Sequence, residues 1–351
     1  MTARLAALAA FATATLAAAY VIDVGGVLAG ALLAGASLTA RLPTNPLAPA
    51  DPLVIGCTLG ALIVEAVVLG WRESSLRRVA LGSDRSVRTD AMYTLIWASG
   101  LMTALGAVMT LGTASAVQGI IERWVGLGVF VSAPLSLAVP CGLIWMSFTS
   151  YWQHRLGHSR WLWPLHKSHH APTSFAVLTV FRAHPIEATL STIMDGVAFG
   201  VIGFSAEAMM LTVLISGVWP LFIHSNILSL GRLESLGVCT PNGHLVHHSV
   251  DPRHHNTNFG GLVNVWDRLF GTYVVPPADV AALAIGVDDS ARVHNTERPF
   301  RAIWIQTMLW IDQVRQESRP AERALPFNRL RPRSPSTALR AASARREAAA
   351  L

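Results

Sequence analysis

The chain has 351 residues, of which 52% are hydrophobic and only 14% are charged. Soluble domains carry about a quarter of charged residues, so this composition excludes an ordinary soluble protein and favours a protein embedded in a membrane. The net charge of +6 resides in residues 319–351, where eight Arg stand against two Glu. The rest of the chain is neutral overall and offers no basic face to a nucleic-acid partner.

The N-terminal part is apolar. Residues 4–40 are rich in Ala, Leu, Val and Gly and are long enough for one tilted membrane span or two short ones. A cleaved signal peptide is the alternative, but no polar stretch follows soon afterwards, so we expect a retained span. The Pro-rich residues 41–52 predict a turn, and residues 53–71 predict a second span.

Glu65 lies inside this second predicted span. A carboxyl group in lipid is costly and usually faces the protein interior. The sequence leaves two roles open for Glu65, a functional role and a hydrogen bond to a neighbouring helix.

The next segments predict the orientation of the chain in the membrane. Residues 72–90 carry five Arg against three acidic residues, and the positive-inside rule places them in the cytoplasm. Residues 91–112 then cross outward. Residues 124–150, bent by Pro134 and Pro140, return and deliver the following segment to the cytoplasmic surface.

Histidines are concentrated in that following segment. Twelve of the thirteen lie between His154 and His255. Residues three and four apart share one face of a helix, so boxes with this spacing should each present their imidazoles to one point. Imidazole binds Zn, Cu, Fe and Ni, so such boxes predict transition-metal sites without selecting the metal. The boxes are His154/His158, His166/His169/His170 and His244/His247/His248.

A hydrophobic hairpin is expected between the second and third boxes, at roughly 188–204 and 207–223. Each arm is short for a span and Asp195 interrupts the first, so we predict a re-entrant or short helical hairpin that returns His224 to the level of the boxes. Nine imidazoles exceed what one metal takes, so the count predicts two metals. Bound imidazoles need acceptors that orient them, and the nearby candidates are Glu187, Asn226, Asp251 and Asp267.

Other metal proteins fit less well. A zinc peptidase needs His-Glu-x-x-His, and none of the boxes has Glu at that position. A metal transporter would place its ligands inside spans or in a low-complexity loop, and a haem protein needs only one or two axial histidines. A non-catalytic membrane metal-binding protein remains the alternative to an enzyme.

From about Trp145 to Tyr273 the sequence resembles the fatty acid hydroxylase / sterol desaturase superfamily of integral-membrane, non-haem di-iron oxygenases. The resemblance rests on the three boxes together with Arg182-x-His-Pro-x-Glu187, His224-Ser-Asn226 and the ending Asn258-Phe-Gly260 … Trp266-Asp-Arg-Leu-Phe-Gly-Thr-Tyr273.

The resemblance implies two iron ions at the cytoplasmic ends of the membrane helices, where O₂ is activated to hydroxylate or desaturate a lipid. It also implies electrons from NAD(P)H through a separate carrier, such as a cytochrome or a ferredoxin. Fatty acyl chains, sterols, alkylglycerol ethers and carotenoids are all substrates of relatives, so the lipid stays open. The eight box histidines would act catalytically through the metals. With His224 they form the implied ligand set, which is His154, His158, His166, His169, His170, His224, His244, His247 and His248. The match does not assign His184, His254, His255 or His294.

We therefore expect an all-α protein, a polytopic bundle of about four spans plus the short hairpin, with a cytosolic helical cap that carries the di-metal site. The apolar residues at helical spacing in 300–314 predict a helix at the membrane interface or packed against the cap. The expected regions are an N-terminal transmembrane region (1–123), a catalytic domain (124–275), a cap with the interfacial helix (276–318) and a disordered basic tail (319–351).

Overall fold

The computed structural model describes residues 52–82, 84–109, 128–287 and 294–317. The expectations for the first span, the Pro-rich turn and the basic tail lie outside these residues. Within them the regular elements are helices, accompanied by three isolated β-bridges, so the all-α prediction is confirmed there. Two compact units divide the chain, Met1–Trp310 and Ile311–Leu351, and every histidine belongs to the first.

The N-terminal helices follow the apolar runs and begin at polar caps. The Ser74 side chain accepts a hydrogen bond from the Arg77 backbone at the start of α3, and Asp84 does the same for Ser86 at the start of α4. Such caps satisfy backbone N–H groups that the first helical turn leaves unpaired. The helices are α2 (Pro52–Leu69), α3 (Ser75–Leu81), α4 (Arg85–Ala98) and α5 (Leu101–Met109).

The predicted crossing at 91–112 is broken. α4 and α5 meet at an angle of 78°, and Gly100 between them has a φ of 76°. That left-handed backbone conformation is open to glycine and ends a helix. The apolar run is therefore two helices that turn at Gly100.

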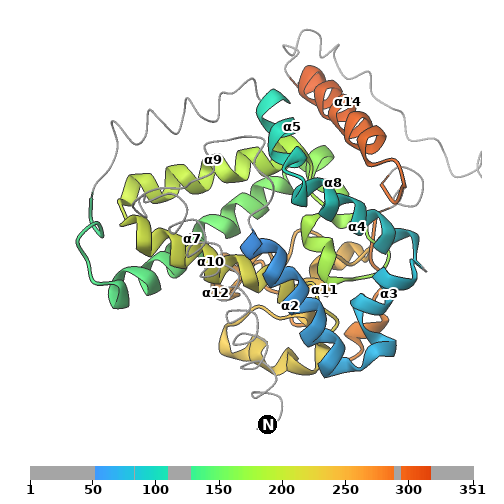
Figure 1. The fold of residues 1–351 in the computed structure, drawn as a ribbon, viewed down its shortest axis with the longest axis horizontal. Helices are drawn as coiled ribbons and strands as arrows, with labels where there is room; N and C mark the ends of the chain where they lie inside the picture. Colours follow the sequence, from blue (N-terminus) through green and yellow to red (C-terminus); the bar gives the residue numbers. More distant parts are fainter. Residues whose placement is uncertain (1–51, 83, 110–127, 288–293, 318–351) are drawn as a thin grey trace, which may run out of the picture. The chain divides into compact units, whose positions relative to one another are not determined.

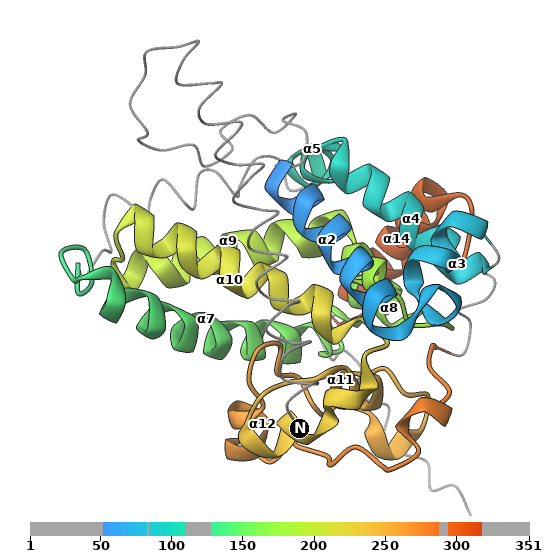
Figure 2. The same ribbon diagram turned by 60° about the horizontal axis from the view of Figure 1, so that its bottom comes forward.

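The central helices are α7 (Leu135–Gly157), α9 (Pro185–Ile202) and α10 (Ala206–Ile223). α7 packs against both α9 and α10, and α5 packs against α9 (Figures 1 and 2). The predicted hairpin is thus present as α9 and α10. Gly203, with a φ of 76°, ends its first arm.

Among the described residues, α9 is the one helix that is long and apolar enough to cross a membrane by itself. The bent pair of α4 and α5 would add a second span, while α2 and α10 contain shorter apolar stretches. The hairpin arm that we expected to be short is the one that qualifies, and the total of about four spans stays a prediction. On α2, Leu59, Ile63 and Val67 are each more than half exposed, and their spacing of four forms one apolar stripe.

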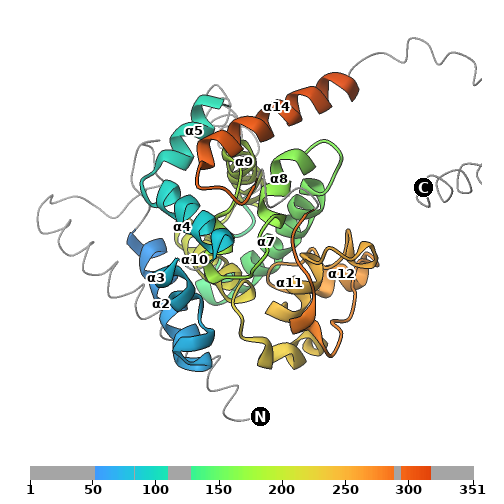
Figure 3. The same cartoon turned by 90° about the vertical axis from the view of Figure 1, so that its right-hand side faces the viewer.

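Three short helices complete this part of the chain. α8 (Trp163–His170) lies between α7 and α9, and α11 (Pro241–His247) and α12 (Val265–Leu269) follow α10. α8 and α11 each have Pro in the first turn, where its missing N–H costs nothing. Buried Glu234 fixes the start of α11 by accepting from the backbone of Thr240 (2.8 Å) and Gly243 (3.2 Å). Figure 3 shows α8 and α11 near the same end of α7. The predicted helix over 300–314 is α14 (Pro299–Glu317).

Candidate metal centre

The nine histidines that the sequence assigned as ligands converge on two points. Within each set, one ring nitrogen per residue lies within 4.8 Å of those of the other members. Group 1 consists of His154, His158, His166, His170 and His247, and group 2 consists of His169, His224, His244 and His248.

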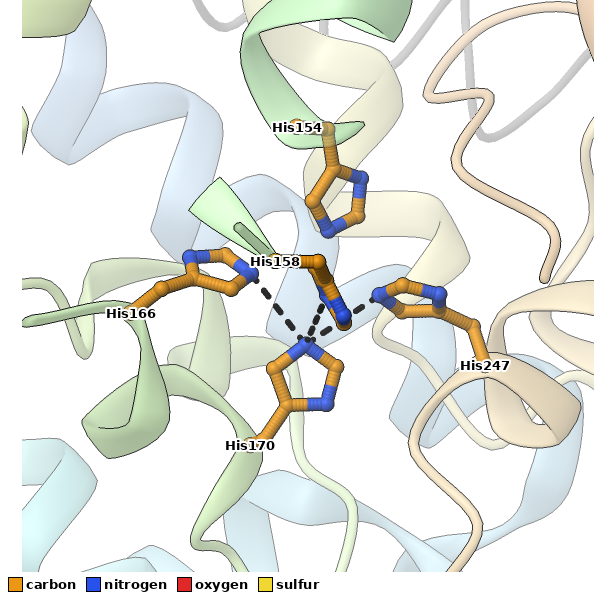
Figure 4. Close-up of side chains that lie close together, drawn as sticks. All are labelled: His154, His158, His166, His170 and His247. Atoms are coloured by element: carbon orange, nitrogen blue, oxygen red, sulfur yellow. Dashed lines mark hydrogen bonds between the residues drawn. The ribbon is translucent and has the colours of Figure 1, made fainter. Parts of the chain in front are cut away.

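Group 1 is arranged around His170 (Figure 4). Its Nε2 atom lies 3.0 Å from Nε2 of His158 and 3.2 Å from Nε2 of both His166 and His247. The ring of His154 points toward the same centre, and its buried Nε2 has no hydrogen-bond partner. A neutral imidazole offers one donor and one acceptor, so four nitrogens that face one another cannot all be satisfied by each other.

Group 2 repeats this arrangement with four rings. Nε2 of His244 lies 3.0 Å from Nε2 of His224 and 3.2 Å from Nε2 of His248. Nε2 of His169 lies 3.4 Å from Nε2 of His224. Three of its four members, His224, His244 and His248, are at most 5% exposed, and His169 is partly exposed.

We expected each box to serve one point. This is confirmed for His154 and His158, which both belong to group 1, and it is wrong for the other two boxes. Helix α8 sends His166 and His170 to group 1 and His169 to group 2. α11 also divides its histidines. It sends His247 to group 1 and both His244 and His248 to group 2. At about 100° per residue, the ends of an i, i+4 pair are 40° apart, whereas the residue between them is 60° from one and 100° from the other. The middle histidine therefore turns away.

Backbone carbonyls fix the orientation of three rings. A carbonyl oxygen can only accept, so the nitrogen that it contacts carries the proton and leaves Nε2 with its lone pair toward the centre. The contacts are His154 Nδ1 with Phe259 O (2.8 Å), His247 Nδ1 with Thr257 O (2.6 Å) and His224 Nδ1 with Pro220 O (2.7 Å).

A strained loop supplies two of these carbonyls. Asn256 and Asn258 have φ values of 58° and 52°, a conformation that Asn tolerates better than most residues. The Asn258 side chain donates to the carbonyls of Gly243 (3.2 Å) and Val274 (3.0 Å). These bonds hold the loop against α11 with its carbonyls toward the histidines. Sequence reasoning did not foresee this role, although Asn258 belongs to the motif that carries the resemblance.

Of the four residues predicted to orient the imidazole rings, two contribute to the site. Glu187 pairs directly with Nδ1 of His166. Asp267 acts one step further away by accepting from the backbone N–H groups of Phe259 and Gly260. The other two candidates lie elsewhere. Asp251 pairs with Arg253, and Asn226 bonds Glu65.

Within the Arg-x-His-Pro-x-Glu stretch, only Glu187 reaches a group 1 histidine. His184 accepts from the Ile186 backbone at the start of α9, and its Nε2 lies 3.0 Å from Thr307 Oγ1. Arg182 is fully buried and pairs with Asp90 at 2.7 Å. Both residues hold helices together. The remaining histidines, His254, His255 and His294, belong to neither group.

Burial keeps the imidazoles neutral. It lowers the pKa of His170, His244 and His248 well below 6.5, and neighbouring imidazoles lower it further. Burial also lowers the pKa of His247 to about 3. At neutral pH these four imidazoles, two in each group, therefore present uncharged nitrogen donors, which is the form that binds a cation.

We expect the metal-free protein to lose stability as the pH falls below about 6.5. The unfolded chain then protonates these histidines while the folded chain does not, so the free energy of unfolding rises with pH in this window. Each such histidine costs on the order of 1 kcal/mol at pH 5.5. Thermal unfolding of metal-free protein should thus give a lower Tm at pH 5.5 than at pH 7.5. A His248→Ala variant should show a smaller shift and a variant of exposed His255 the full shift, and equal shifts in all three would contradict this cause.

One cavity adjoins group 1, and a second lies further along α7. The first, of about 470 Å³, is bordered by His158, His170 and His247, so it opens directly onto group 1. The second, of about 440 Å³, is almost entirely apolar, with Phe148 and Trp266 in its wall.

The donor set fits transition-metal ions. Each group offers several convergent, neutral imidazole nitrogens, and imidazole suits Zn, Cu, Fe and Ni. Nε2 of His154 is buried without a hydrogen-bond partner, and a bound cation would provide this nitrogen with one to contact. Both groups are therefore candidate metal sites.

Comparison with known proteins points to the same region. Residues 139–272 match the fatty acid hydroxylase family. The chain is 25% identical over 206 residues to ornithine lipid hydroxylase OlsE from Rhizobium tropici, which covers 55% of this chain and 59% of that protein. It is 27% identical over 237 residues to alkylglycerol monooxygenase from Danio rerio (66% and 48%). It is 26% identical over 208 residues to Delta(7)-sterol 5(6)-desaturase from Eremothecium gossypii (56% and 52%).

No solved structure matches the chain. The alignments with these three relatives span about half of each relative's length. The domain match and these relatives support a domain of the fatty acid hydroxylase / sterol desaturase type at residues 139–272.

Proposed function

We propose that this protein is a membrane-bound, non-haem di-iron oxygenase that hydroxylates or desaturates a lipid. The observation that carries the proposal is the convergence of nine histidines in two groups. Eight of these residues belong to the three boxes, and all nine lie within the segment that matches the fatty acid hydroxylase family.

In this proposal group 1 holds one iron ion and group 2 holds the other. Bound iron would supply the activation of O₂ that attack on an unactivated C–H bond requires. The protein's own contribution is orientation. Four rings are held by a contact to their Nδ1 atom, from Glu187 and from the carbonyls of Thr257, Phe259 and Pro220. Each contact keeps the proton on Nδ1 and leaves the lone pair of Nε2 free to bind a metal ion.

Two buried aromatic rings help to exclude water from the groups. Phe175 is 4% exposed and lies over the His224 ring, with centroids 5.2 Å apart and an interplanar angle of 25°. Phe259 is 2% exposed and its centroid lies 5.0 Å from that of His158. The cavity beside group 1 offers an approach for a small reactant. Partial exclusion of water limits side reactions of a strong oxidant.

Apolar surfaces support a lipid substrate and a membrane location. The names of the relatives refer to an ornithine lipid, an alkylglycerol and a sterol. These molecules have a large hydrophobic part in common but different polar groups. The cavity beside Phe148 and Trp266 and the exposed stripe on α2 both suit hydrocarbon. We place the histidines on the cytoplasmic side, from the Arg-rich residues 72–90.

The proposal includes an external electron donor, a cytochrome or a ferredoxin that draws on NAD(P)H. It also keeps the predicted division of the chain. Residues 1–123 form the N-terminal transmembrane region, 124–275 the catalytic domain, 276–318 the cap with its interfacial helix and 319–351 the basic tail.

Comparative lipid mass spectrometry tests this function. Cells that express the protein should gain an oxygenated or desaturated lipid that depends on O₂ and disappears in a His247→Ala variant. An Arg253→Ala variant should keep the product, because Arg253 is exposed and belongs to neither group. Unchanged lipids in cells that contain iron-loaded protein and a competent reductant would instead favour a non-catalytic membrane metal-binding protein.

A further inference from the structure

Glu65 is fully buried in α2 and both of its carboxyl oxygens only accept hydrogen bonds. Oε1 accepts from the Asn226 backbone (2.8 Å), from the Asn226 side-chain amide (3.0 Å) and from the Ser75 hydroxyl (3.1 Å). Oε2 accepts from the Ser75 backbone at 2.6 Å. The carboxyl group therefore joins α2 to the start of α3 and to the turn that follows α10.

That turn carries a histidine of group 2. Asn226 stands two residues after His224, the residue that ends α10. The Asn226 amide also donates to the carbonyl of Phe175 at 3.2 Å. The Phe175 ring stacks on the His224 ring and its centroid lies 5.2 Å from that of His248. Glu65 thus holds both the turn beside His224 and, through the same amide, the aromatic residue that covers group 2.

A cation completes this network. The Arg78 guanidinium donates to the Phe175 carbonyl at 2.7 Å and to the Ser75 hydroxyl at 3.4 Å. The Ser75 hydroxyl group therefore bridges the Arg78 guanidinium and the Glu65 carboxyl group. A buried carboxyl group with four donors and a nearby cation is a costly arrangement to build unless all its members are present.

Group 1 is supported by other parts of the chain. Its orienting contacts come from Glu187 and from the carbonyls of Thr257 and Phe259, which lie outside α2. Glu65 also lies outside residues 139–272, the segment that matches the family. Among these orienting contacts, α2 therefore serves the turn beside group 2, whereas those of group 1 come from other segments.

We propose that Glu65 is a positioning residue for the metal of group 2, which it serves by fixing the turn that holds His224. This inference rests on the proposed function, because it assumes that group 2 binds a metal. Loss of the carboxyl group would leave backbone N–H groups of Asn226 and Ser75 buried without an acceptor, so the turn would have to move. A ligand must be held within about half an ångström of its place to bind well.

Metal titration of the full-length protein tests the proposal. Metal-free protein in detergent is titrated with Co²⁺, whose visible absorption reports each site as it fills, and with Fe²⁺ under anaerobic conditions. The unmodified protein should bind two ions tightly. Glu65→Gln keeps the side-chain volume but places an NH₂ group against at least one set of donors. It should bind one ion as before and the second at least tenfold more weakly, as expected when a residue behind a ligand is changed.

Two variants give this result its meaning. His224→Ala should weaken the same single site, and the double variant with Glu65→Gln should be no worse than His224→Ala alone, because both changes act on one position. Glu207→Gln makes the same chemical change at an exposed position in the first turn of α10. It should leave both sites tight.

The possible failures are distinguishable. Glu65→Gln protein that binds two ions with unchanged affinity overturns the role of Glu65 and leaves the proposed function standing. Unmodified protein that binds no ion refutes the proposed function itself. If Glu65→Gln does not fold, Ser75→Ala removes one donor and keeps the carboxyl group. A several-fold loss at one site then supports the proposal, and an equal loss at both sites or at neither overturns it.

Discussion

Replacement of His170 by alanine should reduce the bound iron from about two ions per chain to about one and abolish lipid oxidation. Its Nε2 atom lies 3.0–3.2 Å from three other Nε2 atoms of group 1, so its loss removes the donor around which that group is arranged. Group 2 contains no atom of His170 and should keep its ion. Iron analysis of purified protein, together with the lipid assay, measures both effects.

His244→Ala is the mirror experiment, because Nε2 of His244 lies 3.0 Å from that of His224 and 3.2 Å from that of His248. It should also leave about one ion, and the double variant with His170→Ala should leave none. His255→Ala should keep two. Full retention of iron by either single variant would contradict the corresponding group as a metal site.

Replacement of Arg182 by methionine should lower the free energy of unfolding by about 3–5 kcal/mol, or the Tm by on the order of 10 °C. The side chains of Arg182 and Asp90 are both completely buried and 2.7 Å apart. Removal of the cation leaves the Asp90 carboxylate without its charged partner in the interior. The measurement is thermal unfolding of metal-free protein in detergent, so that any change in metal binding does not contribute.

A double variant separates the ion pair from simple loss of packing. Asp90→Asn combined with Arg182→Met removes both charges and should be more stable than Arg182→Met alone. Arg253→Ala is the matched control, because Arg253 also pairs with an aspartate but is 84% exposed, and it should leave the Tm unchanged. A double variant no more stable than Arg182→Met would show that charge burial is not the cause.

The sequence was sufficient to predict the α9–α10 hairpin and the histidines that converge, because spacing and count are properties of the chain itself. His154 and His158 end α7, and the other boxes lie on α8 and α11. The hairpin also brings His224 to the boxes as expected. The division of the histidines between the two groups was not predicted, although it follows from helix geometry. Neighbours in an HisHis pair point about 100° apart, so they serve different groups.

The contacts behind the histidines were mostly beyond sequence reasoning. Glu187 could be named because its carboxyl group is visible in the sequence. The carbonyls of Thr257, Phe259 and Pro220 have no side-chain signature, since every residue carries a carbonyl group. Their selection depends on the backbone of the loop around Asn258 and on the last turn of α10. The role of Glu65 depended likewise on tertiary contacts, and these favour the open alternative of a hydrogen bond to neighbouring segments.

The shared use of α11 determines when the metal sites can be assembled. This helix gives His247 to group 1 and both His244 and His248 to group 2. Synthesis proceeds from the N-terminus, and upstream segments fold first, so a nascent chain completes neither group before the α9–α10 hairpin has been made. The carbonyls of Thr257 and Phe259 emerge later still. The complete donor sets of both groups therefore form late in the biogenesis of this protein, and a chain truncated ahead of α11 would complete neither group however well its earlier helices fold.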